Sequence, residues 1–266
     1  MNPNQILALF DQEQRREAEY FNMQREVTPS VIRHIPAPGT GGEGVIIYSR
    51  LDAANVEATI REQITYFESI GQDFEWKVYN YDTPSDLKAR LAAHGFEAGE
   101  AEAVLALDLK EAPPTLLKPV THDVRRITHP DKIGDFISVQ EEVWQEDLTW
   151  LAQRLAEGLR HAPEHLSLYA AYVEGVPVSS ARIEFYKHSQ FAALWGGSTL
   201  PDYRKRGLYM ALLAARTQEA YRRGVRFLTV DASPMSHPIL EKFGFQLLTY
   251  THPCKWRVKP PPKEKE

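Results

Sequence analysis

The sequence of 266 residues has little of several features that define other classes of protein. It contains one cysteine, Cys254, which excludes an internal disulfide and any zinc site built from several cysteines, and which favours a reducing compartment. No apolar stretch approaches the roughly 20 residues that a membrane helix needs. The charged residues from Asp11 to Arg16 do not follow the basic-then-apolar order of a signal peptide. We therefore expect a cytoplasmic protein that does not enter membranes.

An excess of positive charge is also missing. The formal net charge is −5 at pH 7, so the surface as a whole is not suited to nucleic acid or to anionic membrane. The nine histidines show no spacing typical of metal ligands, and we expect no bound metal. A hydrophobic share of 43% and a charged share of 25% are ordinary for a globular protein. The length permits one large domain or two modest ones.

The most distinctive pattern lies where an apolar strand, residues 191–200, meets a helical pattern. Between them stand three cations, Arg204, Lys205 and Arg206, followed by Gly207. A helix N-terminus offers unpaired N–H groups and partial positive charge, glycine lets a ligand approach the backbone, and flanking cations add donors. This pattern predicts a site for a diphosphate group. An exposed basic turn is the alternative.

Hydrophobic periodicity predicts alternating strands and helices along the rest of the chain. In the second half we expect a strand at 123–127, helices at 132–145 and 148–160, a hairpin at 166–186, a helix at 208–223, a strand at 225–230 and a short helix at 236–242. In the first half we expect a helix at 5–22, strands at 31–35 and 45–49, a helix at 55–70, a strand at 74–79, a helix at 84–94 and a strand at 103–107.

The two halves share one order of elements, which predicts an internal repeat. The halves differ where the second has the three cations and Gly207, because the first has Leu51-Asp52-Ala53-Ala54-Asn55 there. An aspartate at that place caps a helix and repels phosphate. The first copy is therefore expected to bind no phosphate ligand. Residues 111–119, rich in proline, are expected to be an extended linker, and 259–266 a disordered tail.

The stretch from Leu200 to Leu208, the helix and strand that follow it, and the ending Ile239 to Phe245 resemble the acetyl-CoA-binding half of the GNAT N-acetyltransferases. The resemblance covers roughly Asp123 to Val258. It implies an α/β protein with a mixed sheet and the acyl-CoA N-acyltransferase fold, here in tandem with a degenerate first copy. The expected domains are residues 1–115 and 120–258.

This resemblance implies an enzyme that transfers the acetyl group of acetyl-CoA, its cosubstrate, to an amine of a small molecule or peptide by direct attack. It places the diphosphate on backbone N–H groups from Arg204 to Tyr209 and the acyl-pantetheine arm beside Thr199. Tyr209 stands where the family has glycine or alanine. The implied CoA-binding residues are Thr199, Leu200, Arg204, Lys205, Arg206, Gly207, Leu208 and Tyr209.

For the catalytic groups the sequence offers several candidates. The family often carries a tyrosine acid at the position of Leu240, so Tyr209, Ser236 and His237 are the candidates to replace it. No Asp, Glu or His lies between residues 191 and 200, where relatives often carry a base. Glu184 shares a strand face with Arg182 and is the candidate base, directly or through water. A solvated pair with Arg182 is the alternative.

Two other functions stay open. Leu240 and the missing strand carboxylate are compatible with a CoA-binding sensor or pseudoenzyme without turnover. A nucleotide-binding P-loop is the third possibility, but the spacing Gly-x-x-x-x-Gly-Lys-Ser/Thr is absent. The acceptor, the length of the acyl group and the choice between monomer and homodimer stay open as well.

Overall fold

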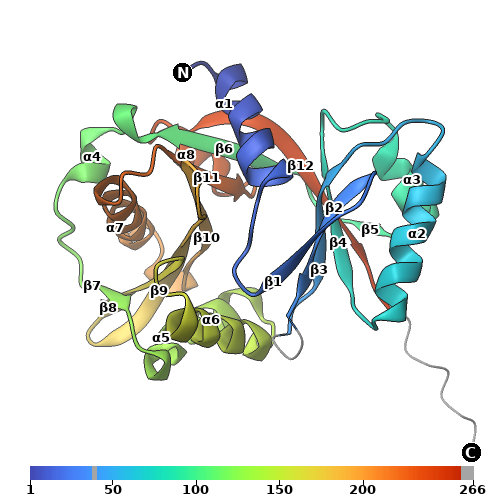
Figure 1. The fold of residues 1–266 in the computed structure, drawn as a ribbon. Helices are drawn as coiled ribbons and strands as arrows, with labels where there is room; N and C mark the ends of the chain where they lie inside the picture. Colours follow the sequence, from blue (N-terminus) through green and yellow to red (C-terminus); the bar gives the residue numbers. More distant parts are fainter. Residues whose placement is uncertain (38–40, 259–266) are drawn as a thin grey trace, which may run out of the picture. The chain divides into compact units, whose positions relative to one another are not determined.

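The computed structural model describes residues 1–37 and 41–258, and the expected tail at 259–266 lies outside these residues (Figure 1). The chain divides into two compact units, each built from several segments. Unit 1 comprises Met1–Met23, Ala37–Gly42 and Ala103–Leu248, and unit 2 comprises Gln24–Pro36, Glu43–Glu102 and the chain from Thr249 onward. None of the helices that the structure describes has the length and apolar content to cross a membrane.

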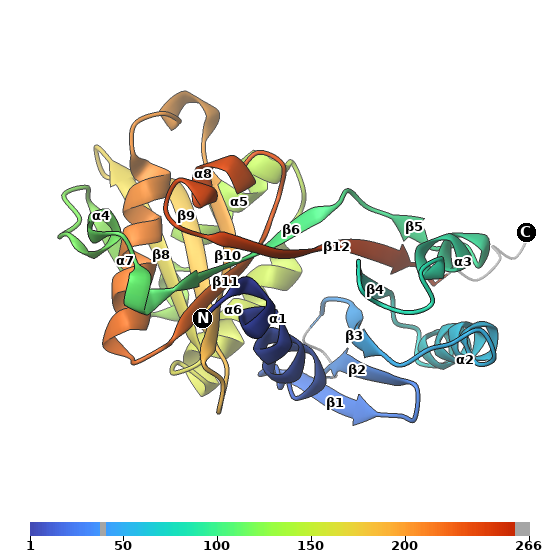
Figure 2. The same cartoon turned by 90° about the horizontal axis from the view of Figure 1, so that it is seen from above.

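Unit 1 is a mixed sheet in the order β6-β11-β10-β9-β8-β7, in which β10 and β11 run parallel and the other neighbours antiparallel. Helix α7 covers one face of this sheet, and α5 and α6 cover the other (Figure 2). Its strands are β6 (Glu102–Asp108), β7 (Val124–Ile127), β8 (Leu166–Val173), β9 (Val176–Phe185), β10 (Phe191–Thr199) and β11 (Phe227–Ala232). Its helices are α1 (Pro3–Phe10), α4 (Pro114–Leu117), α5 (Gly134–Trp144), α6 (Thr149–His161), α7 (Leu208–Arg222) and α8 (His237–Glu241).

The helices of unit 1 form because their apolar residues recur at helical spacing. In α6, Leu151, Leu155 and Leu159 repeat every four residues, and all three are buried in a core with Phe136 of α5 and Leu168 of β8. A helix with such a stripe gains stability by burying it against a sheet. The expected helices at 132–145 and 148–160 are thus confirmed to within about two residues at their ends.

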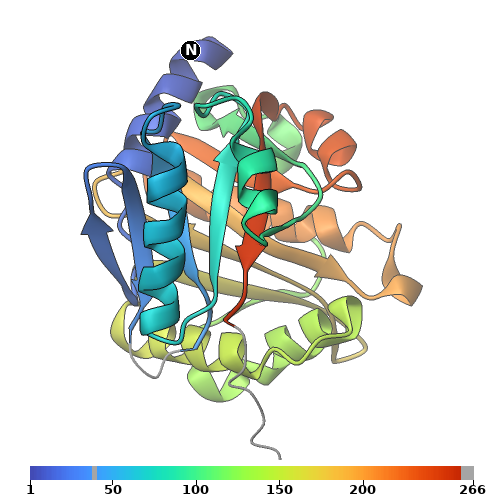
Figure 3. The same ribbon diagram turned by 90° about the vertical axis from the view of Figure 1, so that its right-hand side faces the viewer.

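Unit 2 is a smaller mixed sheet in the order β1-β2-β3-β4-β12, with β5 paired to β12. Helices α2 and α3 lie side by side over one face of it (Figure 3). The core contains Phe67 of α2 stacked on Phe74 of β4, with ring centroids 4.1 Å apart. Its elements are β1 (Met23–Val27), β2 (Val31–Pro36), β3 (Gly44–Ser49), α2 (Val56–Ser69), β4 (Phe74–Tyr79), α3 (Leu87–Ala93), β5 (Glu97–Ala98) and β12 (Gln246–Trp256).

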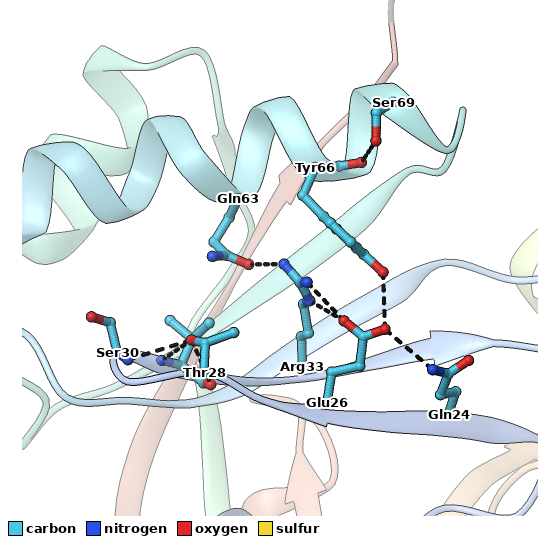
Figure 4. Close-up of polar contacts among 9 residues, drawn as sticks. Gln24, Glu26, Thr28, Ser30, Arg33, Gln63, Tyr66 and Ser69 are labelled. Carbon is cyan, nitrogen blue, oxygen red and sulfur yellow. Dashed lines mark hydrogen bonds and ion pairs between the residues drawn. The ribbon is translucent and has the colours of Figure 1, made fainter.

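A buried arginine ties α2 to the first two strands of unit 2 (Figure 4). Arg33 on β2 donates through Nε to Glu26 Oε2 at 2.8 Å and through Nη1 to Gln63 Oε1 at 2.9 Å. Its guanidinium lies over the Tyr66 ring, 3.2 Å from the centroid, and the Tyr66 hydroxyl donates to Glu26. The guanidinium is therefore neutralised and its donors have acceptors, which is what a buried charge needs to be tolerated.

One strand of each unit, β6 in unit 1 and β12 in unit 2, comes from the other half of the sequence. In unit 1, β11 pairs with β6 from Phe227↔Asp108 to Ala232↔Ala103. In unit 2, β4 pairs with the part of β12 from Thr251 to Trp256. The two units therefore do not coincide with the expected domains 1–115 and 120–258, because each strand is assigned to the sheet with which it forms hydrogen bonds.

The two units contain the same parallel pair, as expected of an internal repeat. In unit 1 the pairing of β10 with β11 runs from Phe191↔Phe227 to Ala193↔Thr229. In unit 2 the pairing of β3 with β4 runs from Gly44↔Phe74 to Ile46↔Trp76. Both pairs are joined by one helix, α7 or α2, and each pairing extends over three residues.

Two local predictions were partly wrong, and one strand was not predicted. The helix expected at 5–22 ends at Arg16, since α1 is followed by a π-helical segment, Asp11–Arg16, and Tyr20 beyond it packs edge-on against Tyr186. The expected extended linker at 111–119 contains α4, whose carbonyl of Leu116 accepts from Gln218 Nε2 at 3.1 Å. Strand β1 was missed, since its polar sequence carries no strand pattern.

Candidate functional site

Strands β10 and β11 separate in the middle of the unit 1 sheet. Their parallel pairing ends at Ala193↔Thr229, after which β10 continues to Thr199 beside β9, and β11 continues to Ala232 beside β6. The facing edges of the two strands beyond this point carry backbone N–H and C=O groups that make no bonds to each other. Such unpaired strand edges can bind an extended ligand through its own amide groups.

A β-bulge lies in β10 just beyond the separation. Arg182↔Trp195 and Ser180↔Ser198 enclose two glycines on β10 but one residue on β9. The first of them, Gly196, has φ of +55°, a conformation that side chains disfavour. Its carbonyl accepts from Gln140 Nε2 of α5 at 2.7 Å.

Gln140 links α5 to both strands that flank the bulge. It is 2% exposed, and its Nε2 also donates to Ser180 Oγ at 2.7 Å. Ser198 Oγ donates to Gln140 Oε1 at 3.2 Å and accepts from Trp144 Nε1 at 3.2 Å. A buried network whose members have partners is rigid, so the backbone of β10 is held in a bent course at this place.

The end of β10 leads within nine residues into the N-terminus of α7. Gly207 precedes the helix with φ of +79°, and no side chain caps this end. Lys205 is also left-handed, with φ of +60°. His122 Nε2 donates to the carbonyl of Arg206 at 3.1 Å and so fixes the turn from outside. The first N–H groups of this 15-residue helix thus have no side-chain cap and lie beside cationic side chains, an arrangement that can hold an anion.

The predicted CoA-binding residues fall into two groups. Arg204, Lys205, Arg206 and Gly207 are exposed around the helix N-terminus, whereas Leu208 is 2% exposed and belongs to the core. Thr199 ends β10, and Leu200 follows it. The Thr199 hydroxyl shares a hydrogen bond of 2.7 Å with Ser179, its carbonyl accepts from Arg204 Nε at 3.2 Å, and the Leu200 N–H donates to Val178.

Tyr209 occupies space that Gly197 leaves open. A Cβ at Gly197 would lie 3.0 Å from Tyr209 Cε2 and 3.8 Å from Nη2 of Arg216, so both side chains lie against β10 on the α7 face. Burial raises the pKa of the Tyr209 hydroxyl, and the positive charge of Arg216 opposes this rise. The tyrosine that replaces the family's small residue is therefore accommodated by a glycine on the facing strand.

Glu184 lies on the opposite face of the sheet from Tyr209. Its row, Glu184↔Ala193↔Thr229, crosses three strands at the point where β10 and β11 separate. Glu184 is 6% exposed and accepts from Arg182 Nε at 3.0 Å. The hydroxyl of Thr229, buried in the same row, has no hydrogen-bond partner among the described residues. The pairing of Glu184 with Arg182 is thus present, but the pair is not a solvated one, since Glu184 is buried and Arg182 is half-buried.

The two remaining acid candidates lie near the start of α8. Ser236 Oγ donates to the Ser233 carbonyl at 3.3 Å within the turn after β11. His237 lies against Glu241, with 3.1 Å between Nε2 and Oε1. Leu240, at the position of the family's tyrosine, is 1% exposed in the core. The structure therefore does not bring Glu184, Tyr209 and Ser236 into hydrogen-bond contact.

Sequence reasoning missed two parts of the site. The Gly196-Gly197 pair inside an apolar strand is a signal for a bulge, and it could have been used. Arg216, by contrast, follows the polar side of the helical pattern, and nothing in the sequence shows that it is 2% exposed. Its burial depends on the faces that α7 presents to β9 and β10.

The geometry defines a class: mixed α/β proteins in which an uncapped helix N-terminus follows a bulged strand that separates from its parallel neighbour. Residues 123–245 match the model of the acetyltransferase (GNAT) family, and this part of the chain is a GNAT domain. No curated protein has a sequence that matches this chain significantly.

Solved structures share the fold over nearly the whole chain. A GCN5-related N-acetyltransferase from Kribbella flavida is 14% identical, with a TM-score of 0.66 over 95% of this chain and 95% of its own. A GCN5-related N-acetyltransferase from Sphaerobacter thermophilus is 16% identical, with a TM-score of 0.59 over 87% and 78%. A tandem GNAT protein from the clavulanic acid biosynthesis pathway is 11% identical, with a TM-score of 0.57 over 98% and 89%. The expected mixed-sheet GNAT fold is confirmed.

Proposed function

We propose that this protein is an N-acetyltransferase that transfers the acetyl group of acetyl-CoA, or a close acyl-CoA, to an amine of a small molecule or peptide. The observation that carries the proposal is the uncapped N-terminus of α7, with Gly207 and three exposed cations, placed directly after the strand that leaves its neighbour. An anion site and an unpaired strand edge at this spacing suit a diphosphate joined to an amide-containing arm. The buried thiol of Cys254 and the absence of a disulfide among the described residues are compatible with a cytoplasmic location.

In this proposal the diphosphate is held by backbone N–H groups from Gly207 to Tyr209, and Arg204, Lys205 and Arg206 supply charge. The pantetheine arm runs along β10 past Leu200 and Thr199 toward the bulge. Backbone N–H groups of β10 in this stretch hydrogen-bond the thioester carbonyl as it becomes an oxyanion. Because the amine attacks this carbonyl directly, holding the two reactants in place is the main contribution of the protein.

The acceptor amine enters on the α5 face in this proposal. Glu184, oriented by Arg182, takes the proton from the attacking amine, directly or through one water. Tyr209 or Ser236 supplies a proton to the departing CoA sulfur. A thiol pKa of about 8.5 makes CoA a reasonable leaving group even with weak acid assistance.

The test is calorimetric titration with acetyl-CoA, followed by thiol release from acetyl-CoA in the presence of a panel of amines. We expect about one acetyl-CoA per chain and amine-dependent release of thiol. Desulfo-CoA should bind similarly and release nothing, which separates binding from turnover. Absence of acetyl-CoA binding would refute the assignment of the helix N-terminus and, with it, the enzymatic function.

A CoA-binding sensor without turnover is the second candidate. Leu240, buried at the position of the family's tyrosine, and the Arg182 pairing of Glu184 are the observations that favour it. Stoichiometric binding of acetyl-CoA with no thiol release from any amine, at several pH values, would support this alternative over the enzyme.

A further inference from the structure

Arg216 is a buried arginine that the proposed roles leave unexplained. It is 2% exposed on the face of α7 that packs against β9 and β10. Its Nε donates to the carbonyl of Leu212 and its Nη1 to the carbonyl of Arg182, both at 3.1 Å. Both acceptors are neutral backbone groups. Hydrogen bonds of this kind satisfy donors but do not cancel a charge.

No carboxylate within residues 1–37 and 41–258 forms an ion pair with Arg216. The nearest acid along the helix, Glu219, accepts instead from Ser167, Tyr169 and Arg223. Burial lowers the pKa of Arg216 to about 10, so its guanidinium is still charged at neutral pH. Arginine is rarely buried without an acidic partner, because the desolvation of its charge is then uncompensated.

The guanidinium of Arg216 lies next to the bulge of β10, on the α7 face of the sheet. The position of a Cβ at Gly197 is 3.8 Å from Arg216 Nη2 and 3.0 Å from Tyr209 Cε2. Tyr209 and Arg216 are seven residues apart on α7, which places them two turns apart on one face. The positive charge of Arg216 favours the ionised form of Tyr209 and so opposes the rise of the Tyr209 pKa. The charge of Arg182 on β9 lowers the pKa of Arg216, and the hydroxyl of Tyr169 on β8 donates a hydrogen bond to Glu219.

We propose that Arg216 is a positioning residue for proton transfer, which favours loss of the phenolic proton of Tyr209 to the CoA sulfur. This inference rests on the proposed acetyltransferase function and names its acid. The amine nitrogen forms a bond to the acetyl carbon, the carbon–sulfur bond breaks, and its electron pair stays on sulfur. The Tyr209 proton moves to sulfur and yields the free thiol of CoA, and solvent then protonates the phenolate.

Among the residues that the structure describes, Arg216 has no negatively charged partner in the resting protein. A negative charge arises near it in this step, first on the reacting thioester and then on the Tyr209 oxygen. A cation that gains its counter-charge only during the reaction stabilises the transition state more than the ground state, which is how a fixed charge accelerates a reaction. An unpaired buried charge also weakens the fold, and such a cost is typical of functional residues.

The experiment uses the full chain and three single variants: Arg216→Met, which removes the charge at similar volume, Arg216→Lys, which keeps it, and Tyr209→Phe. Two double variants combine each Arg216 substitution with Tyr209→Phe. The ionisation of Tyr209 is followed by the ultraviolet absorbance of phenolate, and for each Arg216 form the difference between the titration curves with and without Tyr209→Phe gives the titration of Tyr209. We expect this titration to move up by about one pH unit in Arg216→Met and to stay near wild type in Arg216→Lys.

Thiol release should fall about tenfold or more in Tyr209→Phe and in Arg216→Met, while the acetyl-CoA dissociation constant stays unchanged. The alkaline decline of the rate, where Tyr209 loses its proton, should move to higher pH together with the titration. Arg216→Met should melt no lower than wild type, because the charge that it removes has no partner.

An unmoved Tyr209 titration in Arg216→Met, or a wild-type rate in Tyr209→Phe, would overturn the inference. Failure of the proposed function has a different signature, because the wild type itself would then bind no acetyl-CoA or release no thiol. A purely structural Arg216 would show as a lower melting temperature in Arg216→Met with the pH profile of the rate unmoved.

Discussion

A Cβ atom at Gly197 would lie 3.0 Å from Cε2 of Tyr209, closer than side chains normally approach. Gly197→Ala should therefore displace the Tyr209 ring from β10. We expect a loss of stability of about 1 kcal/mol from overpacking and a fall in thiol release of roughly tenfold or more, since small misplacements at a site are costly. Denaturant unfolding and steady-state rates measure the two effects.

Gly134→Ala is the matched control for this substitution. Gly134 lies at the start of α5, and a Cβ there would meet no atom within 4 Å. Alanine should be neutral or slightly stabilising at this position and leave the rate unchanged. A Gly197→Ala variant with the wild-type rate would mean that the position of Tyr209 is unimportant for turnover.

Gly207→Asp should weaken acetyl-CoA binding without unfolding the protein. The carboxylate would stand at the N-terminus of α7, where it competes with the diphosphate for the same N–H groups and repels it. We expect a loss of at least about tenfold in affinity, or about 1.4 kcal/mol, by calorimetry.

Gly224→Asp, at the other end of the same helix, controls for backbone strain and for added charge. Gly224 has φ of +74° and Gly207 has φ of +79°, so both aspartates are forced into the left-handed region. Gly224→Asp should retain wild-type affinity. Equal affinities for the two variants would show that the helix N-terminus does not hold the diphosphate.

The equivalent turn of unit 2 should bind no CoA, and the stoichiometry should be one per chain. Oδ1 of Asp52 accepts from the N–H groups of Ala54 at 2.8 Å and of Asn55 at 3.0 Å, just before α2. A carboxylate thus already occupies the place of an anion. Asp52→Ala should cost about 1 kcal/mol of stability through the lost cap and leave the stoichiometry at one. Two equivalent sites in the wild type would contradict this assignment.

Acid should destabilise unit 1 in part through Glu219. Burial alone would raise the pKa of this carboxyl, but hydrogen bonds from Tyr169 and Ser167 and the charges of Arg126 and Arg223 lower it below 4.5. A depressed native pKa contributes stability that is present above the unfolded value of about 4.3 and is lost as pH falls through the native value.

Glu219→Gln should therefore be less stable than wild type by about 1–3 kcal/mol at neutral pH, and this difference should shrink as the pH falls below about 4. Unfolding by urea at several pH values gives both curves. The exposed Glu146→Gln is the control and should follow the wild type. A constant difference across the acid range would mean that the ionised form of Glu219 is not preferred by the fold.

The sequence by itself determined most of the helices and strands, because their apolar residues repeat with the period of each element. It also determined the phosphate-binding candidate, since Arg204 to Gly207 and the helix after them are contiguous and need no long-range contact. The turn at Asp52 could be predicted for the same reason, since its residues are also contiguous. Where a feature depends on neighbours in sequence, pattern and chemistry are sufficient to predict it.

Tertiary structure alone decided that β6 pairs in unit 1 and that the part of β12 from Thr251 to Trp256 pairs in unit 2. An antiparallel strand can pair with either sheet, and its own residues do not specify which one. The tertiary structure decided that Glu184 and Tyr209 lie on opposite faces of the unit 1 sheet, which follows from strand register and helix packing. It also decided that Arg216 is buried without a carboxylate. Burial and charge pairing depend on residues distant in sequence, so only the packed fold determines them.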